Sequence, residues 1–253
     1  HILERLSING KLIGIDKDEK AIKFCKKSLS DWKNAQLYHY SYHKIKDILS
    51  ISKVQKVDGM LLDLGLSSAQ LDSKSRGFSY KIDSELDMRF DLSQKLKAND
   101  LLNSKSKKDI ADIIFKYSNE RRSRAIADNI FKMRPIKNVF ELVEAIRRST
   151  PPKNRYKTLA RVFQAMRILV NNELTILENF LSKFYNHLSV GGRIVFISFH
   201  SLEDRIVKHA LKDLSFKKKI KILTKKPLSP SQEENDLNKR SRSAKLRAAE
   251  RIS

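Results

Sequence analysis

The sequence is poor in cysteine and glycine and has no long apolar run. Its single cysteine, Cys25, excludes an internal disulfide and an all-cysteine zinc site, and it fits a reducing cytoplasm. No stretch reaches the roughly 18 successive apolar residues of a membrane-spanning helix. The first ten residues, HILERLSING, lack the apolar core and small-residue cleavage site of a signal peptide. We therefore expect a cytoplasmic protein with no membrane partner.

Acidic residues are also scarce relative to basic ones. The chain has 52 lysines and arginines against 29 aspartates and glutamates, a net charge of +23. Such a surface attracts polyanions, because every phosphate that it neutralises releases condensed counterions. A solvated, lysine-rich surface is the alternative interpretation, and the lysines are spread over the whole chain. Charge therefore favours RNA or DNA as the partner without identifying a binding face.

Short apolar runs alternate with helical patterns in the first 87 residues. The runs LIGID, AQLYHY and VDGMLLDLG have the compact apolar character of parallel strands, and amphipathic segments separate them. This alternation predicts βαβ units and a parallel sheet whose ligands bind at the carboxyl ends of the strands.

The pattern changes to helices between residues 88 and 156. Ser106 with Asp109 and Asn138 with Glu141 resemble capping boxes that precede apolar helix faces, and the prolines of STPPKNRYK close the segment. We expect a sheet domain formed by residues 1–87 and 157–253, with 88–156 as a helical insertion.

The last hundred residues return to the sheet. A helix is expected from about Thr158 to Leu188, with Gly191 and Gly192 as its stop signal. RIVFISF then restores the sheet, and KKKIKILTKK and SRSAKLRAAERI can form an antiparallel pair at its edge.

Two aspartates end predicted strands. Asp16 could hydrogen-bond the ribose of a nucleotide or adenosine cofactor, or it could cap the following helix. Asp63 precedes a turn that contains Ser67, Ser68 and Gln70, whose hydroxyls and amide suit a ligand. A turn that satisfies only its own backbone is the alternative, but it would explain one of these residues rather than the group.

The stretch SFHSLEDRIVK ends a further strand at the same edge. It brings together Ser198, His200, Ser201, Glu203, Asp204 and Arg205. No nucleophile elbow and no H-E-x-x-H motif occurs, which argues against a hydrolase or a zinc protease. We expect Ser201 to cap a helix with Asp204 at its third position, which leaves His200 to face the substrate.

A polar stripe on the expected long helix consists of Arg161, Gln164, Arg167 and Asn171. Such stripes are commonly solvated, but arginines with amides can also grip phosphates. The basic segment NERRSRAIADN allows the same two interpretations.

Five segments resemble the RsmH (MraW) family of S-adenosylmethionine-dependent 16S rRNA methyltransferases. They are DGMLLDLGLSSAQLD, RGFSY with LDMRFD, FQAMRILVNNEL, GGRIVFISFHSLEDRIVK and RSRSAKLRAAER. The match keeps this order and covers nearly the whole chain, from Ile2 to Ile252. TLARVFQAMRI departs from the family, which usually has Pro-Ala-Thr-Arg-Thr before Phe-Gln.

The resemblance implies an α/β class I methyltransferase fold, Rossmann-like, with a mostly parallel sheet, an antiparallel C-terminal strand and an all-α insertion. It implies methylation of the amino nitrogen of a decoding-centre cytidine in 16S rRNA. The family's cofactor contacts fall on Asp16, Tyr42, Asp63 and Gln70. We expect Asp63, Ser67 and Ser68 beside the methyl donor, His200 and Glu203 across the cytosine, and Arg161, Gln164, Arg167 and Arg205 on RNA. No metal is required, and the oligomeric state, with a dimer as one option, stays open.

The family's glycine-rich cofactor loop and first strand would precede His1. We therefore expect an N-terminally truncated fragment of such an enzyme. The alternative is a non-enzymatic RNA-binding remnant, because loss of the loop would remove cofactor binding. A nicotinamide dehydrogenase is disfavoured, because that activity has no use for the turn after Asp63 or for the +23 charge.

Overall fold

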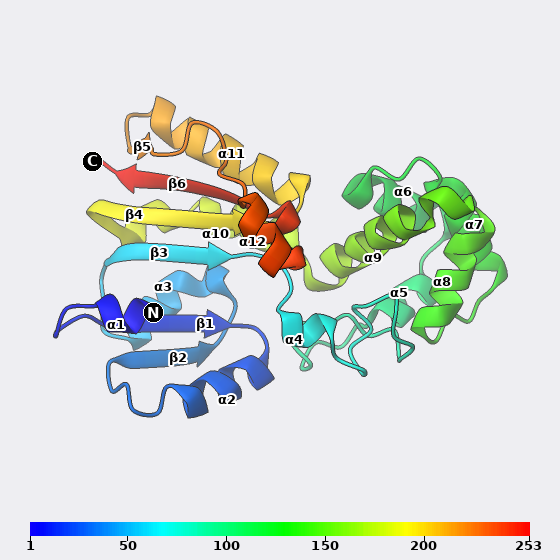
Figure 1. The fold of residues 1–253 in the computed structure, drawn as a ribbon, viewed down its shortest axis with the longest axis horizontal. Coiled ribbons are helices and arrows are strands. Elements are labelled where there is room, and N and C mark those ends of the chain that lie inside the picture. The colour runs from blue at the N-terminus through cyan, green and yellow to red at the C-terminus, as the bar shows by residue number, and fades with distance from the viewer. The chain divides into compact units, whose positions relative to one another are not determined.

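The computed structural model describes all residues, 1–253, as two compact units (Figure 1). Residues 1–65 and 174–253 form one unit, here called the sheet unit. Residues 66–173 form the other, here called the helical unit. The predicted insertion, 88–156, lies within the helical unit, which extends beyond it on both sides.

The strands of the sheet unit form two ladders. Parallel strands β1 (Leu12–Asp16) and β2 (Ala35–His39) make the first. The second has the order β3-β4-β6-β5 and comprises β3 (Val57–Asp63), β4 (Leu188–Ser198), β6 (Lys245–Arg251) and β5 (Ile220–Ile222). β3 and β4 are parallel, whereas β6 runs antiparallel to both β4 and β5. The predicted mixture of parallel strands with an antiparallel C-terminal strand is confirmed, but β6 lies inside the ladder and β5 forms its edge.

Helices and an aromatic cluster complete the sheet unit. The helical elements are α1 (Ile2–Arg5), α2 (Glu19–Ser28), η1 (Tyr42–Lys44), α3 (Ile45–Ile51), α10 (Glu173–Leu181), η3 (Phe184–His187), α11 (Ser201–Phe216), α12 (Gln232–Leu237) and η4 (Lys239–Ser243). Phe180, Phe184 and Phe196 are buried, with the first two rings stacked at 5.8 Å and Phe196 edge-on to both. This packing anchors α10 and η3 against β4.

The helical unit encloses a separate core. Its elements are α4 (Ser68–Leu71), α5 (Ala98–Ser104), α6 (Lys107–Ser118), α7 (Ser123–Lys132), α8 (Val139–Arg148), η2 (Pro152–Asn154) and α9 (Arg155–Asn171). Phe78 and Leu86, before the predicted insertion, and Met166, after it, are buried in this same core. The Asn138–Glu141 capping box is confirmed, whereas Asp109 accepts from the hydroxyl of Ser106 rather than from its backbone N–H.

A polar cluster fixes the irregular segment before α5. The amide of Asn171 donates to the carbonyl of Met88 at 2.7 Å, and its oxygen accepts from the Phe90 N–H at 2.7 Å. Arg89 binds the carboxylate of Asp87 with nitrogens at 2.7 and 2.8 Å. Asn171 belonged to the predicted polar stripe, and it satisfies buried backbone groups instead of facing solvent.

The predicted helix from Thr158 to Leu188 was wrong in its extent. Asn172 takes the left-handed conformation, with φ of 51°, and separates α9 from α10. Gly191 and Gly192 do not stop a helix, because they lie inside β4, where the pairing with β3 shifts register. Gly191 has a φ of 78°, a conformation that glycine adopts without strain. No helix in the chain combines the length and apolar character needed to cross a bilayer.

Candidate active site

The carboxyl ends of β3 and β4 bring two of the predicted segments together. Asp63, the last residue of β3, pairs in register with Ile197 of β4. The chain leaves β4 at Ser198 and enters α11 at Ser201. The sequence-distant groups Asp63 and Glu203 therefore share one edge of the sheet, as predicted for ligand-binding residues of a parallel sheet.

Asp63 is a carboxylate without a partner in the chain. The residue is exposed, and no protein group donates a hydrogen bond to its carboxylate. Partial burial of the carboxyl group and the charge of Glu203 raise the pKa of Asp63 above its ordinary value. A carboxylate held in this way gains from any ligand that donates a hydrogen bond or brings positive charge.

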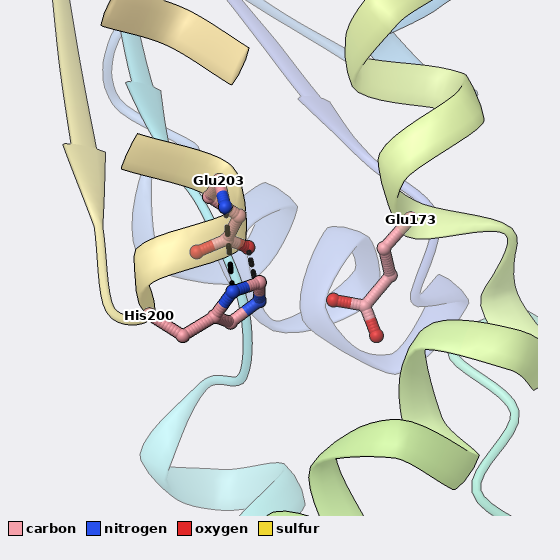
Figure 2. Close-up of side chains that lie close together, drawn as sticks. All are labelled: Glu173, His200 and Glu203. Atoms are coloured by element: carbon pink, nitrogen blue, oxygen red, sulfur yellow. Dashed lines mark hydrogen bonds and ion pairs between the residues drawn. The ribbon is translucent and has the colours of Figure 1, made fainter. Parts of the chain in front are cut away.

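His200 and Glu203 form a buried pair at the start of α11 (Figure 2). The Nδ1 atom of His200 accepts from the Glu203 N–H at 3.4 Å, so the ring proton belongs on Nε2. Nε2 lies 3.2 Å from Oε1 of Glu203, whose Oε2 accepts from the Phe199 N–H at 3.1 Å. The prediction that Ser201 caps this helix was wrong, because His200 is the N-cap residue and pairs with Glu203 three positions later.

Asp204 forms an ion pair with a strand residue and does not take part in the cap of α11, where a capping role was predicted for it. Its carboxylate accepts two hydrogen bonds from Arg247 of β6, at 2.7 and 3.1 Å, and both side chains are largely buried. The pair ties the first turn of α11 to the neighbouring strand. Local sequence contained no signal for it, because the partners are 43 positions apart.

Asp16 and Tyr42 lie in the same unit, near the ends of β1 and β2. Asp16 accepts from the Asp18 N–H at 2.7 Å, and burial raises the pKa of Asp16. The alternative that Asp16 caps α2 is excluded, because Asp18 is the N-cap residue. Tyr42 begins η1 and packs edge-on against Phe180 at 5.5 Å.

Ser67, Ser68 and Gln70 open the helical unit. Ser67 caps α4, and the Ser67 hydroxyl and Gln70 side chain each accept a backbone N–H of the other residue at 3.1 Å. Gln70 is buried, whereas Ser67 and Ser68 are exposed. This capping box fixes the first turn of α4, at the start of the helical unit, and leaves Ser68 on the surface.

The four predicted RNA-binding side chains are in unlike surroundings. Arg167 forms a buried two-nitrogen ion pair with Glu173, at 2.8 and 2.9 Å. Arg161 approaches the buried Glu120 at 3.4 Å while remaining half exposed. Gln164 donates to the Tyr117 carbonyl at 3.3 Å, and Arg205 is exposed on α11. The structure therefore gives Arg167 a partner that neutralises its charge.

The chemistry available at this edge is that of hydrogen-bond acceptors rather than of an activated nucleophile. Asp63 and Glu203 supply carboxylate oxygens, and the Nδ1 lone pair of His200 is engaged by a backbone N–H. Such a group can orient and deprotonate an amine and can accommodate a cation, but it holds no serine or cysteine poised against a base.

Comparison with known proteins gives consistent matches. The model of the MraW methylase family matches residues 1–252. A Kosmotoga olearia protein named ribosomal RNA small subunit methyltransferase H is 49% identical over 99% of this chain and 86% of its own length. Proteins of the same name from Thermosipho africanus and Clostridium botulinum are 46% and 45% identical, over 95% and 99% of this chain and 83% and 88% of their own lengths.

Proposed function

The chain belongs to the MraW methylase family, and on that premise we propose that it methylates the N4 amino group of a decoding-centre cytidine in 16S rRNA, with S-adenosylmethionine as methyl donor. The observation that carries the proposal is the position of Asp63, an unpartnered carboxylate at the end of β3, beside the His200–Glu203 pair that follows β4. The names of the similar proteins, all small-subunit rRNA methyltransferases, support the choice of substrate.

The residues at this edge fit S-adenosylmethionine. That molecule has ribose hydroxyls, an ammonium group and a sulfonium, so it offers both hydrogen-bond donors and positive charge. One oxygen of Asp16 accepts from a backbone N–H, and the carboxylate keeps further acceptor capacity for hydroxyls. Asp63 has the charge and the vacant acceptor sites that a cationic ligand requires. We assign Asp16, Tyr42, Asp63 and Gln70 to the cofactor.

The cofactor, when bound, supplies an electrophilic methyl group. The task left to the protein is to make a poor nucleophile react, because the lone pair of the cytosine amino nitrogen is delocalised into the ring. Acceptance of its N–H hydrogen bonds by Asp63 and by the His200–Glu203 pair would orient that nitrogen and increase its electron density. Positioning of this type accounts for much of the rate enhancement in group transfer. The raised pKa of Asp63, caused by burial and by Glu203, also suits it to take up the proton that the amine releases.

The target base must leave its stack to reach such a site, as base-modifying enzymes require. Ser67 and Ser68, at the start of α4, supply hydroxyls that we assign to contacts with the base or the methyl donor. The net charge of +23 supports an RNA substrate. We assign Arg205, Arg161 and Gln164 to the RNA side and the helical segment 88–156 to RNA recognition. Arg167 is left out of this assignment, because Glu173 neutralises its charge.

The experiment uses small ribosomal subunits from a strain that lacks this modification. The protein is incubated with them and with S-adenosylmethionine that carries a labelled methyl group, and the RNA is digested to nucleosides for mass spectrometry. The proposal expects label in N4-methylcytidine from a single position. Label elsewhere would refute the assigned target, and RNA binding without transfer would favour a non-enzymatic role.

A further inference from the structure

A short basic segment precedes β6, and none of the roles assigned above uses it. Residues 239–245, KRSRSAK, are here called the basic turn. They contain Lys239, Arg240, Arg242 and Lys245 and no acidic residue. The backbone forms η4 up to Ser243 and enters β6 at Lys245.

The basic turn lies at the same sheet edge as the candidate active site. Because β6 runs antiparallel to β4, its first residue, Lys245, pairs with Ser198, the last residue of β4. The Nζ atom of Lys245 is 3.9 Å from a carboxylate oxygen of Asp204, in the first turn of α11. Figure 1 shows α12, which leads into the basic turn, beside the start of β6.

Polar contacts give the basic turn a defined backbone. The Asn238 side chain accepts from the Arg240 N–H at 3.1 Å, and the buried Ser241 hydroxyl donates to the Asn238 carbonyl at 2.8 Å. Leu228 and Leu246 exchange two backbone hydrogen bonds at 3.0 and 2.9 Å, which close the loop at its base. Cations carried on a fixed backbone lose less entropy when they bind a ligand than cations on a flexible tail.

Two cations of the basic turn are not neutralised. Lys239 and Arg242 are exposed, and neither forms an ion pair with an acid of the chain, although α12 just before them carries Glu233 and Glu234. Arg167, by contrast, is paired with Glu173. The basic turn therefore adds two free cations to this edge, beside the exposed Arg205 of α11.

We propose that the basic turn binds phosphates of the RNA strand beside the target base, with Lys239 and Arg242 as direct contacts. This inference rests on the proposed function, since it takes RNA as the substrate at this edge. Phosphate contacts set the position of the strand without reading sequence. Each contact contributes a nearly fixed amount, about 0.7–0.9, to the slope of log affinity against log salt.

The test compares two double variants that remove the same charge. Lys239→Gln/Arg242→Gln alters the basic turn, whereas Lys26→Gln/Lys27→Gln alters two exposed lysines in the last turn of α2. Binding of a 16S rRNA fragment that contains the target cytidine is measured by fluorescence anisotropy at several salt concentrations. We expect the salt slope of the first variant to fall by about 1.5, and that of the second by less than about 0.5.

Two further measurements show whether a change in salt slope comes from the lost charge or from damage to the fold and the cofactor site. Lys239→Arg/Arg242→Lys retains the charge and should restore the slope, and calorimetric binding of S-adenosylmethionine should be equal in all variants. Equal slopes for both glutamine variants, with a wild-type protein that methylates RNA, would overturn the role of the basic turn and leave the proposed function intact. A wild-type protein that neither binds nor methylates the RNA would overturn both.

Discussion

Arg247 on β6 donates two hydrogen bonds to Asp204 in the first turn of α11, at 2.7 and 3.1 Å. The adjacent residue, Glu203, faces the candidate active site, so this ion pair fixes the helix end from which Glu203 projects. Arg247 is thus a positioning residue, because it acts on the site through the backbone of α11.

Loss of this ion pair should destabilise the protein. Arg247→Met leaves a largely buried carboxylate without its hydrogen-bonded partner and with only the more distant Lys245, and breaking a buried pair typically costs about 3 kcal/mol or more. Arg193→Met is the matched control, because Arg193 of β4 joins Glu250 of β6 in a largely exposed pair that contributes at most about 1 kcal/mol. Urea unfolding of both variants measures the difference, and equal losses would contradict the structural role assigned to Arg247.

The contribution of the Arg247–Asp204 ion pair to the free energy of unfolding should depend on pH. Burial opposes ionisation of Asp204, but the hydrogen bonds and charge of Arg247 outweigh it, and the pKa of Asp204 falls below its ordinary value of 3.8. The unfolded chain therefore binds a proton more readily, and the stabilisation is present above that value and lost as the pH falls below it. The gap in urea midpoint between wild type and Arg247→Met should narrow from about pH 6 to about pH 3. A constant gap would show that Asp204 is not the group that titrates.

Asp63→Asn should separate stability from function. Burial and the charge of Glu203 raise the pKa of Asp63, so its ionised form is disfavoured in the folded protein and destabilises it above that pKa. Removal of the charge should raise the melting temperature at neutral pH by on the order of 1 °C, while calorimetric binding of S-adenosylmethionine weakens by at least about tenfold. Unchanged binding would remove Asp63 from the cofactor site.

Asn172 provides a test of the boundary between α9 and α10. Its φ of 51° is tolerated by asparagine and glycine but strained for alanine. Asn172→Ala should therefore lower the free energy of unfolding by about 1 kcal/mol, and Asn172→Gly should lower it by less. Chemical denaturation measures both, and a stabilising Asn172→Ala would mean that the helix prefers to continue.

The sequence carried enough information for the main elements and for the edge that holds the site. VDGMLLDLG is a strand ending at Asp63, and its apolar run before a carboxylate and a glycine is a local signal. The alternation of strands and helices then places Asp63 and the segment after β4 at one edge, without any knowledge of side-chain contacts.

Two kinds of feature could not be predicted from the sequence. In the first, several nearby residues carry the same local signal, and in the second, the partners are far apart in the chain. Gly191–Gly192 and Asn172 all permit a left-handed residue, and the local pattern does not reveal which of them ends a helix. The cap of α11 fell on His200 rather than Ser201, because Glu203 pairs with the imidazole three positions before it. The Arg247–Asp204 pair requires the register of β6 against β4, which only the folded sheet defines.

The most direct test of the account is the rate of methyl transfer to cytidine N4 by Asp63→Asn and by Asp58→Asn. Both substitutions remove one exposed carboxylate from β3, but Asp58 lies near the opposite end of the strand. In single-turnover assays on unmodified small subunits, we expect Asp58→Asn to stay within about twofold of wild type and Asp63→Asn to fall by at least about 100-fold. Transfer by Asp63→Asn at the wild-type rate would contradict the account.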